Sequence, residues 1–166
     1  QNGAGLYLSS AGSNGFVANS IFIGNSASQE GGAIWTGGSS STALINNTIY
    51  NNSATNEGGG IYISVNSSNA IKNNIIWNNT SANGADVASL GSSEVDHNLI
   101  SEGVIGSNDF SSDPLFADAA NGDFTLTTGS VAINGGDNAS IPLDRPDLDG
   151  DADEAEDLPF DFAGNA

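Results

Sequence analysis

Cysteine and methionine are both absent from the 166 residues. The chain therefore has no disulfide framework and no thiol nucleophile, and without an initiator methionine we expect a mature or excerpted product. No apolar run approaches the roughly 20 residues that a membrane-spanning helix needs, so we expect no insertion into a membrane. Only 37% of the residues are hydrophobic while 22 are glycine, which disfavours a compact helical domain.

Positive charge is also scarce. The chain carries 20 acidic side chains against Lys72 and Arg145, a formal net charge of −18, which excludes nucleic acid and anionic lipid as partners. Glu30 and Glu57 are the only acids before Asp86, and the other 18 follow. We therefore expect a nearly neutral N-terminal body and an acidic C-terminal region that holds cations.

What the sequence has in abundance is a repeat of 27 residues. Residues 30–35 and 57–62 are near copies, and asparagine recurs at the same interval at Asn25, Asn52 and Asn79. A fixed period of this size predicts stacked coils rather than a globule. Each segment recurs in the same direction, which predicts parallel, in-register pairing between coils instead of hairpins. The fold class is therefore all-β, a parallel solenoid with about 27 residues per coil.

The repeat also predicts how one domain is organised. Residues 1–108 accommodate four coils, of which the fourth is degenerate because its strand, at residues 95–100, follows the previous copy after 23 residues. Residues 109–166 are expected to add a terminal coil or coils and an irregular acidic tail to the same domain. Four coils at the usual strand spacing rise only about 20 Å.

The recurring asparagines are interpreted as structural. A sharp corner between two strands needs a residue in the left-handed region, which glycine and asparagine tolerate best. Stacked asparagine side chains also hydrogen-bond from coil to coil, so we expect Asn25, Asn52 and Asn79 to form a ladder. Glycosylation at Asn-x-Ser/Thr matches such as residues 46–48 is the alternative.

Strand alternation predicts two aromatic columns on the outer surface. They consist of Tyr7, Trp35 and Tyr62 on one face and of Tyr50 and Trp77 on another. Exposed rings stack on sugar rings or pack against a partner chain. The alternative is that each ring only stacks on its copy in the next coil, which stabilises neighbouring strands by about 0.2–1 kcal/mol per pair.

Several short motifs resemble known families. Residues 31–34 read Gly-Gly-Ala-Ile and residues 22–25 read Phe-Ile-Gly-Asn, similar to the GGAI and FxxN motifs of polymorphic outer membrane protein repeats. Asp-Pro-Leu-Phe from residue 113 and Asn-Gly-Asp-Phe-Thr-Leu from residue 121 resemble the choice-of-anchor Q domain of bacterial secreted β-helix proteins. The resemblances imply a right-handed parallel β-helix, secreted or displayed on a cell surface, usually without assigned catalysis.

The resemblance also implies what the ends look like. That family usually continues through Pro-Arg into a final strand ending Gly-Ala-Tyr-Glu, whereas this sequence stops at Ala166. We therefore expect both ends of the solenoid to lack caps. Uncapped ends expose unpaired backbone groups, which favours end-to-end stacking of copies into a filament.

No catalytic residue is assigned from the sequence. The β-helix enzymes that this fold resembles act on acidic polysaccharides with Lys or Arg beside calcium, or hydrolyse with clustered Asp, but Lys72 and Arg145 lie far apart in the chain. The best candidates for a catalytic trio are Asp96, His97 and Asp113, in the degenerate coil. Ice binding is disfavoured because no Thr-x-Thr column recurs. We expect a protein that is not an enzyme.

The sequence thus predicts an extracellular structural or cell-surface module that is adhesin-like or forms a matrix or filament. The expected partners are other copies of the chain, cell-surface or matrix components, and glycans. A carbohydrate-binding module that uses the aromatic columns is one alternative. A glycan-degrading β-helix enzyme is the other.

The acidic tail predicts a calcium site. Residues 144–161 contain nine carboxylates, and Asp147, Asp149, Asp151 and Asp153 occupy alternate positions around Gly150. Carboxylates two residues apart in a loop converge on one hard cation and otherwise repel one another. The spacing differs from an EF-hand loop because Leu158 would occupy its twelfth position. A solvated acidic turn without calcium is the alternative.

Removal of calcium is therefore expected to lower the melting temperature by several degrees. A ligand held at 100 times its dissociation constant stabilises by about 2.7 kcal/mol, because it binds only the folded chain. Scanning calorimetry with calcium, with chelator, and after calcium is restored measures the effect. A melting temperature indifferent to chelator rejects the calcium site.

Overall fold

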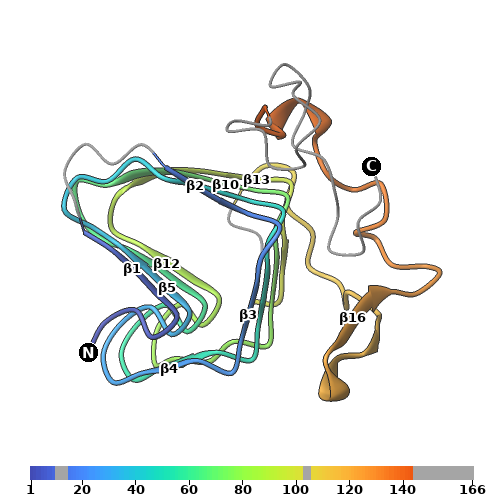
Figure 1. The fold of residues 1–166 in the computed structure, drawn as a ribbon, viewed down its shortest axis with the longest axis horizontal. Helices are drawn as coiled ribbons and strands as arrows, with labels where there is room; N and C mark the ends of the chain where they lie inside the picture. Colours follow the sequence, from blue (N-terminus) through green and yellow to red (C-terminus); the bar gives the residue numbers. More distant parts are fainter. Residues whose placement is uncertain (10–14, 103–105, 144–166) are drawn as a thin grey trace, which may run out of the picture.

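The computed structural model describes residues 1–9, 15–102 and 106–143. Their strands wind around one axis as a solenoid with three parallel sheets on its sides (Figure 1). This confirms the predicted all-β parallel solenoid. In these three stretches, no helix is both long and hydrophobic enough to span a bilayer.

Each main sheet takes one strand from every coil. The first sheet contains β1 (Leu6–Leu8), β5 (Ile34–Thr36), β9 (Ile61–Ile63) and β12 (Val87–Ser89). The second contains β2 (Phe16–Ala18), β6 (Ala43–Ile45), β10 (Ser68–Lys72) and β13 (Ser92–Asp96). The third contains β3 (Ile21–Ile23), β7 (Thr48–Tyr50), β11 (Ile75–Trp77) and β14 (Leu99–Ile100). Short strands β4 (Ser26–Ala27) and β8 (Ser53–Ala54) pair beside them.

Pairing between coils is parallel and follows the predicted register. In the third sheet Phe22 pairs with Ile49, and Ile49 pairs with Ile76. The last step differs from the expectation of 23 residues, because Ile75 pairs with Leu99, 24 residues on. The reason is that Asn98, just before Leu99, continues a column of buried asparagines in the coil interior.

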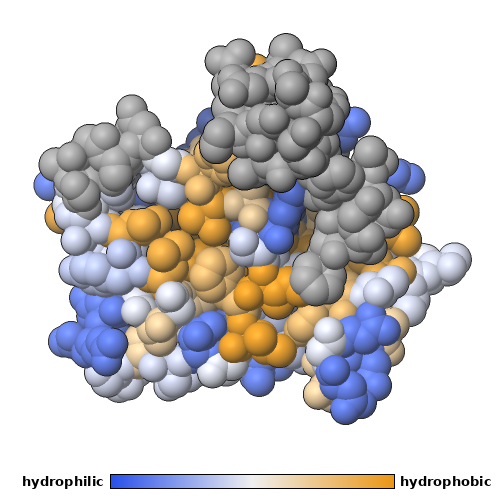
Figure 2. Space-filling model, viewed as in Figure 1, coloured by the Kyte–Doolittle hydropathy of each residue, from blue (hydrophilic) through white to orange (hydrophobic). Residues whose placement is uncertain are grey.

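The inward side chains of the middle coils form the core. Ile34, Leu44, Ile49, Ile61 and Ile76 are completely buried, as alternation in strands requires. Their counterparts in the first coil, which include Leu6 and Phe22, pack on this core but are only partly buried. Figure 2, which has the viewpoint of Figure 1, shows hydrophobic side chains gathered in the middle of the visible face.

Residues 109–143, the described part of the region predicted to hold the terminal coils and the acidic tail, are only partly coiled. Parallel pairing reaches only Phe110, which forms a bridge with Leu99. Next come the antiparallel hairpin of β15 (Phe116–Asp118) and β16 (Asp123–Leu126), joined by a turn of 3-10 helix η1 (Ala119–Asn121), and then η2 (Asn138–Ser140). This segment lies on the outside of the solenoid (Figure 1).

The outward ring of Tyr50 explains where the hairpin docks. Phe116 and Phe124 meet it edge to face, with ring centroids 5.9 and 5.4 Å from that of Tyr50. Further along, Asn73 and the backbone of Asp137 exchange two hydrogen bonds of 3.0 and 2.8 Å. The hairpin therefore packs two partly buried rings against the third sheet, a contact that favours docking because it covers apolar surface.

The paired glycines of the repeat have two separate structural causes. Gly31 and Gly58 have φ angles of 66° and 59°, in the left-handed region that side chains with a Cβ disfavour. Gly32 instead lies against the next coil, where a Cβ would overlap the carbonyl oxygens of Gly59 and Ser53. The motif therefore marks a turn followed by a close approach between coils.

Substitution of Gly32 by alanine is expected to lower the free energy of unfolding by about 1–3 kcal/mol, because backbone must move to admit the methyl group. The matched control is Gly15→Ala, where a Cβ meets no atom within 4 Å and a change within about 0.5 kcal/mol is expected. Urea denaturation of both variants measures the difference. Equal free energies of unfolding for the two variants would contradict a close contact between coils at Gly32.

Candidate functional site

Two neighbouring asparagines perform the two roles, left-handed corner and hydrogen-bonded ladder, that the sequence analysis assigned to a single residue. Asn46, Asn51, Asn73 and Asn78 have φ angles between 53° and 59°, so they make the left-handed corners. The residue after each of them is a buried asparagine that faces the interior of the coil. The first residue of each pair therefore bends the chain, and the second provides hydrogen bonds.

Asn25, Asn52 and Asn79 lie in one column and are hydrogen-bonded from coil to coil. The backbone N–H and the side-chain Nδ2 of Asn25 both donate to Oδ1 of Asn52, each over 2.9 Å. Asn52 donates in the same way to Asn79. The remaining amide hydrogen of Asn52 reaches backbone carbonyls, including that of Phe22. In each coil the backbone N–H and the side-chain amide of this asparagine therefore donate to the asparagine of the next coil, toward the C-terminal end.

A second ladder of the same kind lies at the corner between the second and third sheets. Asn47 donates to Asn74, and Asn74 donates to Asn98, over distances of 2.9 to 3.0 Å. The sequence analysis did not single out this column. A sequence signal was present, since Asn47 and Asn74 lie 27 residues apart in the Asn-Asn pairs 46–47 and 73–74.

Both ladders end on a buried aspartate. Asn79 donates to Oδ1 of Asp86, and Asn98 donates to Oδ1 of Asp109 over 2.8 and 3.1 Å. The other oxygen of Asp86 accepts from the backbone N–H and the hydroxyl of Ser101, both at 2.6 Å. A carboxylate suits this position because it only accepts, whereas one more asparagine would need another acceptor.

Each ladder therefore ends on a carboxylate acceptor and not on a further asparagine. Asp86 is 1% exposed and stands where the previous coil has Gly60, whose missing Cβ would point toward Nδ2 of Asn79. An acid at the glycine position of the repeat thus reaches the ladder directly. The replacement is visible in the sequence, because residues 85–88 read Ala-Asp-Val-Ala where the earlier coils have their glycine-rich entry.

The first aromatic column is stacked but largely buried, which corrects the expectation of exposed rings. Tyr7 and Trp35 stack with centroids 4.5 Å apart, and Trp35 and Tyr62 follow at 6.4 Å. Trp35 is 9% exposed and Tyr62 5%, whereas Tyr7 is 51% exposed. The cause is local, because Gly31 and Gly37 bring backbone directly against the Trp35 side chain. Only Tyr7 offers a face to a ligand.

Two carboxylates flank this stack. Glu30 accepts a hydrogen bond from Nε1 of Trp35 at 3.2 Å, and Glu30 and Glu57 are paired in adjacent coils. Burial, and then the charges of Glu30 and Glu57, raise the pKa of the Tyr62 phenol above its ordinary value. Glu30 therefore orients the indole, and burial together with the two carboxylates favours the protonated form of the Tyr62 phenol.

The second column, Tyr50 and Trp77, is in register as predicted but also differs from an exposed pair. Both residues are partly buried, and Phe116 and Phe124 of the tail already cover the Tyr50 ring. The aromatic partner of Tyr50 is therefore the chain's own hairpin.

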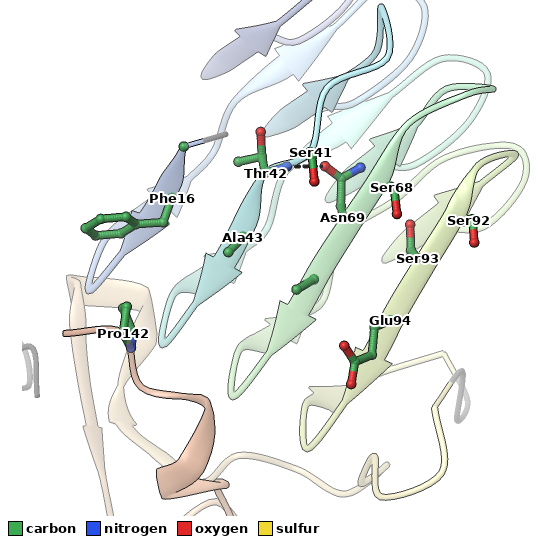
Figure 3. Close-up of a pocket in the computed structure, with 12 residues that line it drawn as sticks. Phe16, Ser41, Thr42, Ala43, Ser68, Asn69, Ser92, Ser93, Glu94 and Pro142 are labelled. Carbon is green, nitrogen blue, oxygen red and sulfur yellow. Dashed lines mark hydrogen bonds between the residues drawn. The ribbon is translucent and has the colours of Figure 1, made fainter. Parts of the chain in front are cut away.

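The sequence reasoning missed a groove on the outer face of the second sheet. It has a volume of about 850 Å³ and crosses β2, β6, β10 and β13. Figure 3 shows Phe16 at one end of the groove, Glu94 at the other, and Pro142 of the tail beside them. The floor carries small side chains such as Ala43 and Ala70.

One part of the candidate catalytic trio comes together. Nδ1 of His97 lies 3.0 Å from the Asp96 carboxylate, which also accepts from the backbone and side chain of Asn108. Desolvation alone would raise the pKa of Asp96, but the Asn108 hydrogen bonds and His97 outweigh it and lower that pKa. Asp113 accepts instead from the Leu115 N–H. Asp96 and His97 form a surface pair without the third member.

The comparisons with known proteins agree with this geometry. The family described as "Right handed beta helix region" matches residues 1–139. The chain belongs to the right-handed β-helix family. No curated protein and no solved structure matches the chain significantly.

The four aspartates assigned to calcium, Asp147, Asp149, Asp151 and Asp153, lie outside the described residues of this β-helix. Within the described residues, no three His, Asp or Glu side chains gather closely enough to hold a metal ion. The buried carboxylates Asp86 and Asp109 are instead committed to the ladders.

Replacing Asp86 with asparagine is expected to lower the free energy of unfolding by about 1–3 kcal/mol. The new amide places a donor against either Asn79 or Ser101, which also donate. The control Glu94→Gln removes the same charge from a side chain that is 67% exposed and is expected to change stability by less than about 1 kcal/mol. Urea denaturation measures the free energy of unfolding of both variants. Equal losses would contradict the role of Asp86 as the terminal acceptor of its ladder.

Proposed function

We propose that the chain is a structural module of an extracellular or cell-surface protein, a rigid β-helix that presents its faces for adhesion. The observation that carries this proposal is the pair of asparagine ladders, each ended by a buried aspartate. They give the solenoid a specific, hydrogen-bonded interior without disulfides, in a chain that has no cysteine. A rigid domain of this kind suits a structural scaffold better than a protein whose function requires conformational change.

The disposition of acidic groups supports a non-catalytic role. Asp86 and Asp109 are buried and saturated with hydrogen bonds, so neither is available to transfer a proton. Asp96 is held by Asn108 and His97 on an open surface. A glycosidase needs two carboxyl groups that flank one bond, and the described part of the chain offers no such pair in the groove.

The ladders favour a discrete module over a filament of stacked copies. In both ladders the backbone N–H and one amide hydrogen of each asparagine donate toward the C-terminal end, where Asp86 and Asp109 accept them. Oδ2 of Asp109 also accepts from the Gly106 N–H at 2.8 Å. A second copy stacked on this end would place the acceptor Oδ1 of its Asn25 against these carboxylates. A carboxylate cannot donate a hydrogen bond to that oxygen. Contacts through the sides of the β-helix, with a cell surface or matrix, are the proposed mode.

Calcium in the acidic tail belongs to the same proposal. Nine carboxylates in residues 144–161 repel one another strongly in a dilute cytosol-like buffer, and millimolar calcium outside cells would neutralise them. An extracellular location would therefore supply the calcium that this tail is proposed to bind.

Labelling of intact cells tests the proposal. Antibodies raised against the purified chain are expected to stain unpermeabilised cells that produce the full-length protein, and externally added protease is expected to remove the signal. A cytosolic protein serves as the control for cell integrity. Staining that appears only after permeabilisation contradicts an extracellular module.

A further inference from the structure

Five asparagines in the sequence are followed directly by glycine, and four of these pairs lie wholly within the described residues. Glycine has no side chain to shield its backbone nitrogen from the carboxamide of the asparagine before it. The nitrogen can therefore attack that carboxamide, provided that its N–H is not held in a hydrogen bond. The four pairs are Asn2-Gly3, Asn83-Gly84, Asn121-Gly122 and Asn134-Gly135.

In three of the four pairs the glycine N–H is held. Gly3 donates to the carbonyl of Glu30 in the next coil over 2.9 Å. Gly122 and Gly135 each donate over 3.2 Å to the carbonyl of the residue three positions earlier, within their own turns. The carboxamide of Asn121 is held as well, because its Nδ2 donates to a carboxylate oxygen at 2.7 Å. Attack in these pairs requires that a hydrogen bond first be broken.

The Asn83-Gly84 pair, just before β12 (Figure 1), lacks these restraints. Both of its residues are exposed. No hydrogen bond to a described residue holds the Gly84 N–H or the Asn83 carboxamide. The attacking nitrogen and the carbon that it attacks are therefore both free in the folded chain.

We propose that Asn83 is the site of spontaneous deamidation in the folded chain. The Gly84 nitrogen forms a bond to Cγ of Asn83, and the side-chain nitrogen leaves as ammonia with the proton that the backbone nitrogen gives up. Water then opens the resulting five-membered succinimide. Opening at one carbonyl gives aspartate, and opening at the other gives isoaspartate, in which the main chain runs through the former side chain.

The product adds charge at the contact between the third and fourth coils. Glu30 and Glu57 already lie opposite each other in adjacent coils, and Glu57 pairs with Asn83. Deamidation therefore places a third carboxylate in this column. Like charges directly opposite each other on neighbouring strands destabilise their pairing.

Isoaspartate also alters the backbone of the same contact. The Asn83 N–H donates to the Asn56 carbonyl over 3.0 Å, and the Asn83 carbonyl accepts from Gly58 over 3.2 Å. In isoaspartate that carbonyl leaves the main chain, which gains one carbon. Three residues further on is Asp86, whose carboxylate ends one asparagine ladder. Deamidation to isoaspartate therefore loosens the contact on which that ladder ends.

Ageing of the full chain in mildly alkaline buffer, followed by peptide mapping, tests the proposal. Mass spectrometry of chymotryptic peptides locates each conversion of an amide to an acid, and isotopically labelled water marks the conversions that occur during ageing. A hydrogen bond of about 1 kcal/mol slows the attack about fivefold. Conversion at Asn83 is therefore expected to be about fivefold or more faster than at Asn2, Asn121 and Asn134.

The same chain unfolded in urea is the matched control, because every pair then keeps its glycine but loses its hydrogen bonds, and the four rates are expected to become similar. Asn83→Gln, whose longer side chain does not form the five-membered ring, is expected to lack the main acidic product of the parent chain on anion exchange. Equal rates in the folded chain overturn the proposal. A preference for Asn83 that persists unchanged in urea also overturns it, because the folded structure would then not be its cause.

Discussion

The asparagine ladders are the constraint on which the rest of the structure depends. A parallel coil must turn sharply several times in about 27 residues, and each turn brings polar backbone into the interior. The buried amides of Asn52 and Asn74 satisfy carbonyls of their own and the preceding coil, while they bind the next asparagine. Because an unpaired buried polar group costs about 1–3 kcal/mol, the coils can stack only in the register that aligns these columns.

That register explains both what the sequence predicts well and what it cannot predict. The period and the inward positions of Ile49 and Ile76 follow directly from repetition and alternation. The sequence does not show which asparagine of a pair bends the chain and which one stacks, because this depends on backbone angles. The burial of Trp35 likewise depends on how a glycine turn folds over it, and the docking of the tail depends on the distant pairing of Phe116 with Tyr50.

The ladders also have a direction, which gives the two ends of the solenoid different chemistry. Each asparagine donates toward the C-terminal end, so the last coil must provide an acceptor that needs none itself. Asp86 and Asp109 meet that requirement with one oxygen and bind loop N–H groups with the other. Asp86 in the fourth, degenerate coil thus ends one ladder, and Asp109, directly after that coil, ends the other.

The buried asparagines of the two ladders are engaged in stacking between coils, so only the outer faces of the solenoid are left to contact other molecules. Two of those faces are occupied by the chain itself, through the glycine turns and the tail hairpin. On the second sheet the outward Ala43 and Ala70 alternate with the fully buried Leu44 and Ile71. The groove on that sheet therefore follows from the same strand alternation that builds the core.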